Sequence, residues 1–331
     1  MPKVLRIHQP IGIDGLRIDE VPLATPPENY VRIKVSACGL NWGDVDYMRD
    51  NYTESLAKLP ARFGGDTVGI IDAIGTAVDS SWLEQRVCSI PYFYGPNGEH
   101  GEFALIDQNY IVPAYEGFTD IQAASVWGQY TTAYFGLIKQ GKLETGQNIL
   151  ISAATSTAGI AAIKVANMIG AKTICTTRSE KSKDFLYKMG ATSVLVSKDN
   201  ELCEEIKSIT KNEGISLVYD PIGGKFFDQY LYALAEDAII ILYGGIDDSP
   251  IHLDLEIQLE LTKRNAALRF FSVQNYTHDM IEARKFIENG FKSGKLPAIV
   301  DRTYSFEDYK QAYAYMGAKR ESHGKIILTI D

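Results

Sequence analysis

The sequence lacks the features that would assign it to a membrane, a secreted scaffold or a repeat array. No apolar run in its 331 residues approaches the roughly 20 residues that a membrane-spanning helix needs. The opening residues, MPKVLRIHQP, contain no continuous apolar stretch of the kind found in secretory signal peptides. Internal repeats and low-complexity tracts are also absent. We therefore expect a globular, cytoplasmic protein with no membrane partner.

Cysteine is scarce and widely spaced. The four cysteines are Cys38, Cys88, Cys175 and Cys203, and no two of them form a C-x-x-C pair. Disulfide frameworks belong to short, cysteine-dense secreted chains, which this sequence does not resemble. We expect reduced thiols that lie in the core or in a pocket.

Positive charge is in short supply. The chain has 42 acidic and 33 basic side chains, which gives a formal net charge of -9. Because proteins that bind nucleic acid need an excess of Lys and Arg, nucleic acid is excluded as the main partner. The length is too great for one small core, so two domains are expected.

Familiar acid–base machinery is missing as well. The sequence shows no paired carboxylates and no Ser or Cys with a neighbouring base, and its five histidines are scattered. Nucleophilic catalysis of the kind that needs a base-activated side chain is therefore disfavoured. His100 is the only histidine near the motifs described below.

The most informative stretch present is 146–191, GQNILISAATSTAGIAAIKVANMIGAKTICTTRSEKSKDFLYKMGA. Its hydrophobic spacing predicts a strand at Asn148–Ser152, a helix around Ile160–Met168 and a second strand at Lys172–Thr176. Small residues fill the turn from Ala153 to Gly159, where a glycine-rich fingerprint would allow backbone N–H groups to reach a pyrophosphate. Ala153 and Ser156 are bulkier than glycine, so an ordinary strand–helix–strand unit with a tight turn remains the alternative.

The rest of the chain predicts two kinds of domain. Residues 1–120 hold short β-prone runs separated by Gly, Pro, Asn and Asp, whereas from Asp120 helices alternate with apolar strands, a pattern typical of a parallel sheet. The last part of the chain loses that alternation. We therefore expect a β-rich domain at 1–120 and 273–331, with a dinucleotide-binding domain inserted at 121–272. The predicted parallel strands are Ile149–Ser152, Thr173–Thr176, Ser193–Val196, Leu217–Asp220, Ile239–Tyr243 and Leu268–Phe271.

In this order the motifs resemble the medium-chain dehydrogenase/reductase superfamily, and within it the zinc-free quinone oxidoreductases. The resemblance runs nearly end to end, and its motifs are CGLNWGD (38–44), FGGDTVG (63–69), TTAYFGL (131–137), YDPIGG (219–224), LYGG (242–245) and ESHGKIILTI (321–330). It implies an α/β fold: a GroES-like β-rich catalytic domain plus an inserted Rossmann domain with a doubly wound parallel sheet. FGGDTVG departs from the family's P-G-x-E-x-x-G, since Phe63 replaces the proline.

The resemblance also bears on metal. The positions that match the three zinc ligands of related alcohol dehydrogenases are Asn41, Gly65 and Gly128, and none offers a thiolate or an imidazole. No cysteine lies within Pro91–Glu102, where a structural zinc lobe would be expected. We therefore expect no metal. Without a Lewis acid an alcohol is hard to oxidise, whereas an electron-poor acceptor needs only a hydride donor and hydrogen-bond donors. A quinone or an α,β-unsaturated carbonyl (an enone) fits this requirement.

Three residues are candidates for the catalytic site by resemblance. Asn41 would donate its amide N–H to a carbonyl or to the nicotinamide ribose, Tyr52 would line the substrate cleft, and Thr132 would pack on the nicotinamide face. A loop-structuring role for Asn41 and simple packing for Tyr52 remain open. The aromatic run 92–94 either walls an apolar pocket or forms a hydrophobic hinge.

NADPH is the expected cofactor. Thr177 stands where an NAD enzyme usually carries a carboxylate for the ribose 2′-hydroxyl, and Arg178 and Lys181 follow. A guanidinium and an ammonium suit a 2′-phosphate, although Glu180 counts against it. Ser197 stands where the family often has a tyrosine near the cofactor. By resemblance the cofactor contacts are Asn41, Thr132, Ser156, Thr157, Ala158, Thr177, Arg178, Lys181, Ser197, Gly244, Ile246, Phe271, Val273 and Lys325.

The leading hypothesis is an NADPH-dependent, zinc-independent oxidoreductase that transfers hydride to a quinone or another α,β-unsaturated carbonyl. The alternatives are an enoyl-thioester or alkenal double-bond reductase, and a non-catalytic NADPH-binding relative. We also expect a homodimer, because Leu268–Ser272 is apolar and is the last predicted strand of its sheet. An exposed edge of this kind is prone to pair with a second copy.

Overall fold

The computed structural model describes residues 1–331 apart from 57, 92–97, 198–200, 319, 321 and 331. The chain divides into two compact units, each of which is considered by itself. The first unit comprises Met1–Gly128 and Pro297–Asp331, and the second comprises Gln129–Leu296. The aromatic run 92–94 lies outside the described residues.

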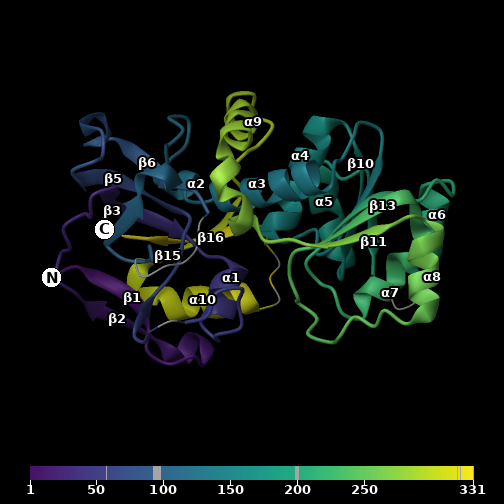
Figure 1. Ribbon diagram of the computed structural model, residues 1–331, viewed down its shortest axis with the longest axis horizontal. Helices are drawn as coiled ribbons and strands as arrows, with labels where there is room; N and C mark the ends of the chain where they lie inside the picture. The colour runs from purple at the N-terminus through teal and green to yellow at the C-terminus, as the bar shows by residue number, and fades with distance from the viewer. Residues whose placement is uncertain (57, 92–97, 198–200, 319, 321, 331) are drawn as a thin grey trace. The chain divides into compact units, whose positions relative to one another are not determined.

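The first unit is built on β-sheets. A seven-stranded sheet has the order β15-β16-β3-β5-β6-β8, with β7 also paired to β3, and a smaller sheet has the order β2-β1-β4 (Figure 1). The strands are β1 (Lys3–Ile7), β2 (Leu16–Glu20), β3 (Tyr30–Gly39), β4 (Ala61–Arg62), β5 (Thr67–Ile74), β6 (Arg86–Ser89), β7 (Phe103–Asp107), β8 (Ile111–Pro113), β15 (Val300–Ser305) and β16 (Lys325–Thr329). The described helices are α1 (Trp42–Tyr47), α2 (Asp120–Ala123) and α10 (Tyr309–Gly317).

Strand β3 organises this unit because it is the longest and pairs with three neighbours. Its residues alternate between buried and less buried positions, as expected of a strand with one face on a core. Val31, Ile33 and Val35 are buried together with residues of β5 and β7. The register places Gly39, the last residue of β3, opposite Ile327 of β16.

One predicted strand of the first unit is wrong in extent. The run Glu102–Ile111 was expected to be continuous, but it forms β7 and β8 on either side of a 3-10 turn at Gln108–Tyr110. The carboxylate of Asp107 accepts a hydrogen bond from the backbone N–H of Asn109 at 2.9 Å. Local capping of this kind competes with strand hydrogen bonds and ends β7 at Asp107.

The second unit contains the parallel sheet that the sequence predicts. Its order is β11-β10-β9-β12-β13-β14, and every adjacent pair is parallel. Its strands are β9 (Asn148–Ile151), β10 (Lys172–Thr177), β11 (Ser193–Val196), β12 (Ile215–Asp220), β13 (Leu234–Leu242) and β14 (Ala267–Phe270). Its helical segments are α3 (Trp127–Tyr134, whose first two residues belong to the first unit), a π-helix (Phe135–Gln140), α4 (Thr157–Ile169), α5 (Lys183–Met189), α6 (Leu202–Ile209), α7 (Phe226–Tyr230), α8 (Leu255–Lys263) and α9 (Met280–Lys292).

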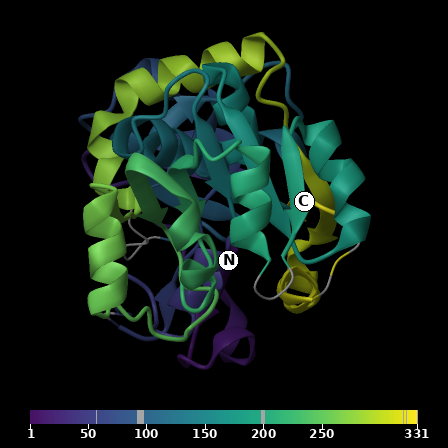
Figure 2. The same cartoon turned by 90° about the vertical axis from the view of Figure 1, so that its right-hand side faces the viewer.

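The strands are covered on both faces, which explains why they are apolar runs. Helices α4 and α5 lie on one side of the sheet, and α7 and α8 lie on the other (Figures 1 and 2). All four residues of β9, NILI, are buried. Leu150, Val218 and Ile240 from three neighbouring strands belong to one core with residues of α6 and α7. Continuous burial of this kind is typical of parallel sheets.

Strand β13 begins earlier than the sequence predicts. The helical pattern of 225–234 continues to Leu234, but Leu234 pairs with Ile215 of β12, and the strand runs on to Leu242. The register shifts next to Ile215, and Asp237 has a φ of +58°. Pairing with a neighbouring strand therefore outweighs the local helical pattern at this point.

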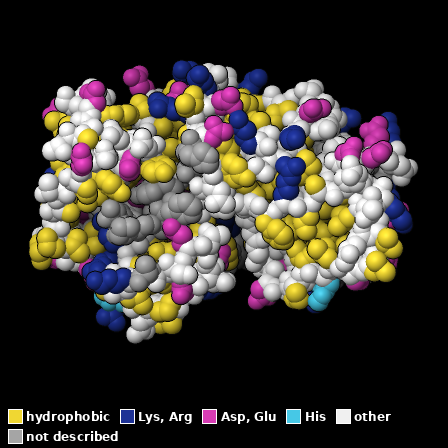
Figure 3. Space-filling view, in the orientation of Figure 1, with side chains coloured by type: hydrophobic (Ala, Val, Ile, Leu, Met, Phe, Trp, Pro, Cys, Tyr) yellow, Lys and Arg dark blue, Asp and Glu magenta, His cyan; other side chains and the backbone are white. Residues whose placement is uncertain are grey.

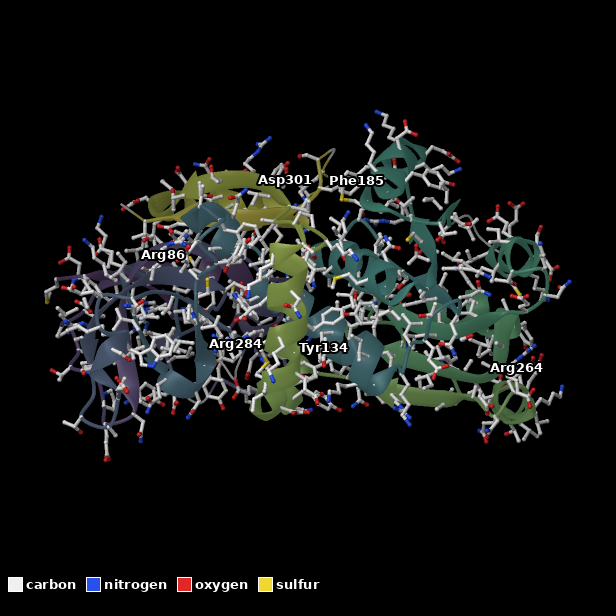
Figure 4. The ribbon with its side chains drawn as sticks, turned by 90° about the horizontal axis from the view of Figure 1, so that it is seen from above. Arg86, Tyr134, Phe185, Arg264, Arg284 and Asp301 are labelled. Carbon is white, nitrogen blue, oxygen red and sulfur yellow. The ribbon has the colours of Figure 1, made fainter. Side chains whose placement is uncertain are left out.

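The unit boundaries differ from the domain boundaries expected at 120/121 and 272/273. Gly128 belongs with the first unit, where its backbone N–H donates to Asp66 at 2.8 Å. Helix α9 belongs with the second unit, because Phe286 packs on Tyr134 with ring centroids 5.3 Å apart and Phe291 packs on Tyr130. Figure 4 shows Tyr134 next to α9, which carries Arg284.

Strand β14 forms one edge of the parallel sheet, as predicted. Phe270, at its end, is 80% exposed. Lysines and arginines are scattered and mixed with acidic side chains among the described residues of the face shown in Figure 3, so they form no broad basic patch there. None of the helices in the described part of the chain has the length and apolar character needed to cross a membrane.

Candidate active site and cofactor-binding turn

The first unit brings Asn41, Asp66 and Lys325 together in one polar cluster. The ammonium of Lys325 donates to Asn41 Oδ1 and to Asp66 Oδ2, each at 2.6 Å. Asn41 Nδ2 donates to the same Asp66 oxygen at 3.0 Å. Lys325 has no exposed surface and Asp66 is 7% exposed, whereas Asn41 is only partly buried. Asn41 is therefore the member of the cluster that meets solvent.

Local structure places each of these side chains. Asn41 follows the end of β3 and caps α1, and its backbone N–H donates to the Asp44 carboxylate at 2.8 Å. Asp66 has a φ of +54° and follows Gly64, whose φ is +92°. This left-handed turn directs Asp66 away from the course of β5. Lys325 is the first residue of β16, which pairs with the end of β3.

Glycines make room for the cluster. A Cβ at Gly39 would lie 2.7 Å from Lys325 Cε, and a Cβ at Gly128 would lie 2.5 Å from both carboxylate oxygens of Asp66. A Cβ at Gly65, by contrast, would meet nothing within 4 Å. Two of the three positions that match zinc ligands are therefore glycines, and their surroundings differ.

No alternative set of metal ligands is present in the part of the chain that the structure describes. Its His, Cys, Asp and Glu side chains form no group of three that could hold a metal ion. Burial raises the pKa of the nearby Cys38 thiol well above its usual value, and the carboxylates of Asp44, Glu99 and Asp66 act in the same direction. Cys38 therefore stays protonated and is a poor ligand.

His100 is a packed side chain with no exposed surface. Its ring contacts Phe63 edge-on at 5.3 Å, and its Nδ1 lies 3.3 Å from the Tyr313 hydroxyl. That hydroxyl donates to Asp44 at 3.2 Å, so Nδ1 must carry the hydrogen that Tyr313 accepts. Burial lowers the pKa of His100 below 6.5, although Asp44 and the backbone of Gly65 oppose this. His100 is therefore neutral near pH 7.

The turn after β9 has the geometry of a dinucleotide-binding turn. Ala153 has a φ of +44°, a left-handed conformation in which glycine would be less strained. Ser156 caps α4, and its Oγ accepts from the Gly159 N–H at 3.0 Å. A Cβ at Gly159 would lie 2.7 Å from Ala154 Cα, so only glycine allows this approach. The backbone N–H groups of Thr157 and Ala158 open the helix and can face an anion.

The end of β10 presents cationic side chains. Thr177 is buried, and its Oγ1 accepts from the Ser179 N–H at 3.3 Å. Arg178 and Lys181 are exposed. Glu180, which counts against a 2′-phosphate in the sequence, forms an ion pair with Lys183 at 2.9 Å. This pairing offsets its charge, so the residues present fit an anionic 2′ substituent.

The remaining predicted cofactor residues are distributed over the same unit. The backbone N–H of Ser197 donates to Thr177, and its hydroxyl donates to Gln229 at 3.2 Å. Gly244 and Ile246 follow β13 and are exposed, Phe271 is buried beyond β14, and Val273 is partly buried. Thr132 lies on α3 and is partly buried.

Sequence reasoning missed two features of the candidate sites. Asp66 was not named, although it occupies the acidic position of the motif FGGDTVG. Tyr219 and Tyr243 stack at the ends of β12 and β13 with ring centroids 4.0 Å apart, and no pattern in the sequence predicts this pair. Asn41 and Lys325 were predicted for separate contacts, and the structure joins them directly. Tyr52, which is partly buried, lies beside α1, where a Cβ at Gly43 would be 3.2 Å from its ring.

Comparison with known families covers most of the chain. Residues 27–130 match the alcohol dehydrogenase GroES-like domain, and residues 158–289 match the zinc-binding dehydrogenase family. The chain belongs to the medium-chain dehydrogenase/reductase superfamily. The α/β class, with a GroES-like domain and a parallel-sheet Rossmann domain, is thereby confirmed.

Individual proteins are similar to this superfamily member along its length. Quinone oxidoreductase of Sus scrofa is 26% identical over 94% of this chain and 92% of its own. A mycocerosic acid synthase-like polyketide synthase of Mycobacterium tuberculosis is 28% identical over 98% of this chain. This chain spans only 15% of the length of that synthase and of the other polyketide synthases that it matches.

Solved structures share the fold of this superfamily member. Escherichia coli quinone oxidoreductase, complexed with NADPH, superposes with a TM-score of 0.87 at 22% identity, covering 99% of both chains. The CurK enoyl reductase superposes with a TM-score of 0.87 at 24% identity, covering 100% of this chain and 99% of its own. At these identities the likeness establishes the fold.

Alanine substitutions at Gly128 and Gly65 should differ in their effect on stability. The Gly128→Ala methyl would be forced against Asp66, which Lys325 holds in place, and overpacking of this kind costs about 1–3 kcal/mol. The Gly65→Ala methyl enters open space and should change the free energy of unfolding by less than about 0.5 kcal/mol. Urea denaturation measures both, and equal effects would contradict the described packing.

Acid should destabilise the protein partly through His100. Because its pKa is lowered in the folded state, the unfolded chain binds the extra proton first. The stability contributed by neutral His100 is present above pH 6.5 and is lost as the pH falls below that value. Urea unfolding of His100→Gln between pH 7 and pH 5 should show a shallower loss than the unsubstituted protein. Parallel curves would mean that His100 is not buried in its neutral form.

Proposed function

We propose that this protein is an NADPH-dependent, zinc-independent reductase whose acceptor is a quinone or another α,β-unsaturated carbonyl. The observation that supports it most directly is the amide of Asn41, which Lys325 and Asp66 hold from two sides at the partly exposed end of their cluster. Asp66 uses one of the two Nδ2 hydrogens, and the other is available to an acceptor oxygen. A preorganised donor of this kind stabilises negative charge as it develops.

The second unit supports NADPH as the cofactor. The start of α4 offers backbone N–H groups to a diphosphate, and Gly159 permits the close turn. Arg178 and Lys181 supply positive charge for a 2′-phosphate at the end of β10. The similar quinone oxidoreductase of Escherichia coli is described as a complex with NADPH, which agrees with this assignment. Bound NADPH would supply the hydride.

The chain's own residues then act by position. Asn41 donates its amide hydrogen to the acceptor oxygen, where negative charge grows during reduction. Tyr52 lines the acceptor side, and Thr132 packs against the nicotinamide. His100 is buried and neutral, so it is no charged acid that could protonate the product. Water therefore supplies the proton.

Enoyl-thioester or alkenal double-bond reduction is the second candidate. It is favoured by the similarity to a polyketide synthase and to the CurK enoyl reductase. Both reactions need a donor to the same oxygen, so the geometry of Asn41 accommodates either. NADPH consumption over matched quinones, enones, enals and enoyl-CoAs separates them. If none of these acceptors is reduced while NADPH still binds, the chain is a non-catalytic relative.

Substitution of Asn41 tests the proposed reaction. Loss of an oxyanion donor typically costs about 2.7–4 kcal/mol, so Asn41→Ala should lower kcat by about a hundred-fold or more with the best acceptor. Asn51→Ala is the matched control, because Asn51 is exposed and lies just beyond α1. Near-normal turnover in Asn41→Ala would remove Asn41 from the mechanism.

Substitution of Arg178 tests the choice of cofactor. A lost charge-assisted hydrogen bond costs about 1.5–3 kcal/mol, so Arg178→Ala should raise the NADPH dissociation constant about ten- to hundred-fold. NADH binding should hardly change, and Lys188→Ala on the exposed face of α5 serves as the control. Fluorescence titration measures the constants for both cofactors in each variant. Equal weakening of NADPH and NADH would mean that Arg178 does not bind the 2′-phosphate.

We further propose a homodimer formed through β14, in a protein that acts in the cytoplasm. Strand β14 is an edge of the parallel sheet, and the exposed Phe270 lies at its end. Pairing about a two-fold axis would satisfy the strand's hydrogen bonds and cover this ring. Light scattering at micromolar concentration should give twice the 36.7 kDa of one chain. A monomer mass would rule out the dimer.

A further inference from the structure

Lys325 is a fully buried charged side chain beside the candidate active site. Its exposed fraction is 0%, and its ammonium has two oxygen partners, Asn41 Oδ1 and Asp66 Oδ2, both at 2.6 Å. The second oxygen of Asp66 accepts from the Gly128 N–H at 2.8 Å. Both ends of the ion pair are therefore fixed by several hydrogen bonds, which a buried pair needs to be stable.

This arrangement allows only one orientation of the Asn41 amide. Its acceptor, Oδ1, faces an ammonium that can only donate, and its donor, Nδ2, faces a carboxylate that can only accept. A flipped amide would point N–H at the ammonium and oxygen at the carboxylate. Both contacts would then be repulsive, so the cluster selects the orientation with an N–H at the solvent side.

The space around Lys325 is also shaped for it. Gly39 leaves the room that the lysine stem occupies, since a Cβ there would lie 2.7 Å from Cε. Lys325 cannot touch a substrate directly because none of its surface is exposed. Any effect on the reaction must therefore pass through Asn41.

We propose that Lys325 is a positioning residue, whose ammonium serves as a built-in cation at Asp66 and holds and polarises the amide of Asn41. The positive charge on the carbonyl side draws electron density from the amide and strengthens Nδ2–H as a donor. Asp66 supplies the opposite contact and keeps the ammonium charge balanced. This inference rests on the proposed function for its kinetic consequence, but the amide orientation can be tested without it.

The kinetic test compares Lys325→Met with the double variant Lys325→Met/Asp66→Asn. The single variant leaves the Asp66 charge buried and uncompensated, whereas the double variant removes both charges and should recover folding stability. We expect kcat to fall about ten- to hundred-fold in both variants, as for other residues that orient a ligand group, with KM for NADPH little changed. Lys310→Met, on the exposed face of α10, is the control.

The outcomes separate a positioning role from a purely structural one. If kcat stays low in the double variant although its urea midpoint recovers, the positioning role is supported. If kcat recovers together with stability, Lys325 only maintains the fold and the proposal is overturned. Unchanged kcat in the single variant overturns it as well.

A second readout does not depend on turnover. The side-chain amide of Asn41, assigned in an NMR spectrum by its loss in Asn41→Ala, should show one protected hydrogen facing Asp66. In Lys325→Met/Asp66→Asn both hydrogens should exchange with solvent faster, and their shifts should converge. An Asn41 signal that does not change overturns the proposal. If no acceptor is reduced by the unsubstituted protein, the proposed function fails and this readout still decides the role of Lys325.

Discussion

The candidate active site depends on one buried ion pair, formed by Lys325 and Asp66. An ammonium with no exposed surface is stable only beside a compensating charge, and removal of either partner from such a pair typically costs about 3–5 kcal/mol. Gly39 and Gly128 are small because the two side chains fill the space beside them. The orientation of Asn41 follows from the pair, and so does the direction of the amide hydrogen left for a ligand.

The pair also explains what kind of chemistry suits the site. A single positive charge balances the single charge of Asp66, and the neighbouring Cys38 and His100 are held in neutral forms by burial, which raises the pKa of the thiol and lowers the pKa of the imidazole. Such a site stabilises an oxygen by hydrogen bonding and does not ionise a hydroxyl, which favours reduction of an electron-poor acceptor. The second unit complements this with a helix start and two exposed cations that suit a phosphorylated dinucleotide.

Sequence reasoning succeeded where the signal is local. Contiguous apolar runs predicted the strands of the parallel sheet, and the small residues between Ala153 and Gly159 predicted its turn. It was wrong where tertiary pairing decides: Leu234 joins β13 because Ile215 lies beside it, and β7 ends where Asp107 caps a turn. The contact of Lys325 with Asp66 joins residues 259 positions apart, so no local pattern could predict it. The resemblance named Asn41 and Lys325 but not their mutual hydrogen bond.

The central claim is that an internal ammonium, not a metal ion, organises this site. Elemental analysis of protein purified in zinc-containing buffer, with NADPH oxidation assayed before and after dialysis against a chelator, tests it most directly. The account predicts far less than one zinc per chain and unchanged activity after dialysis. About one tightly bound zinc per chain, with activity lost on its removal and restored by zinc, would contradict it.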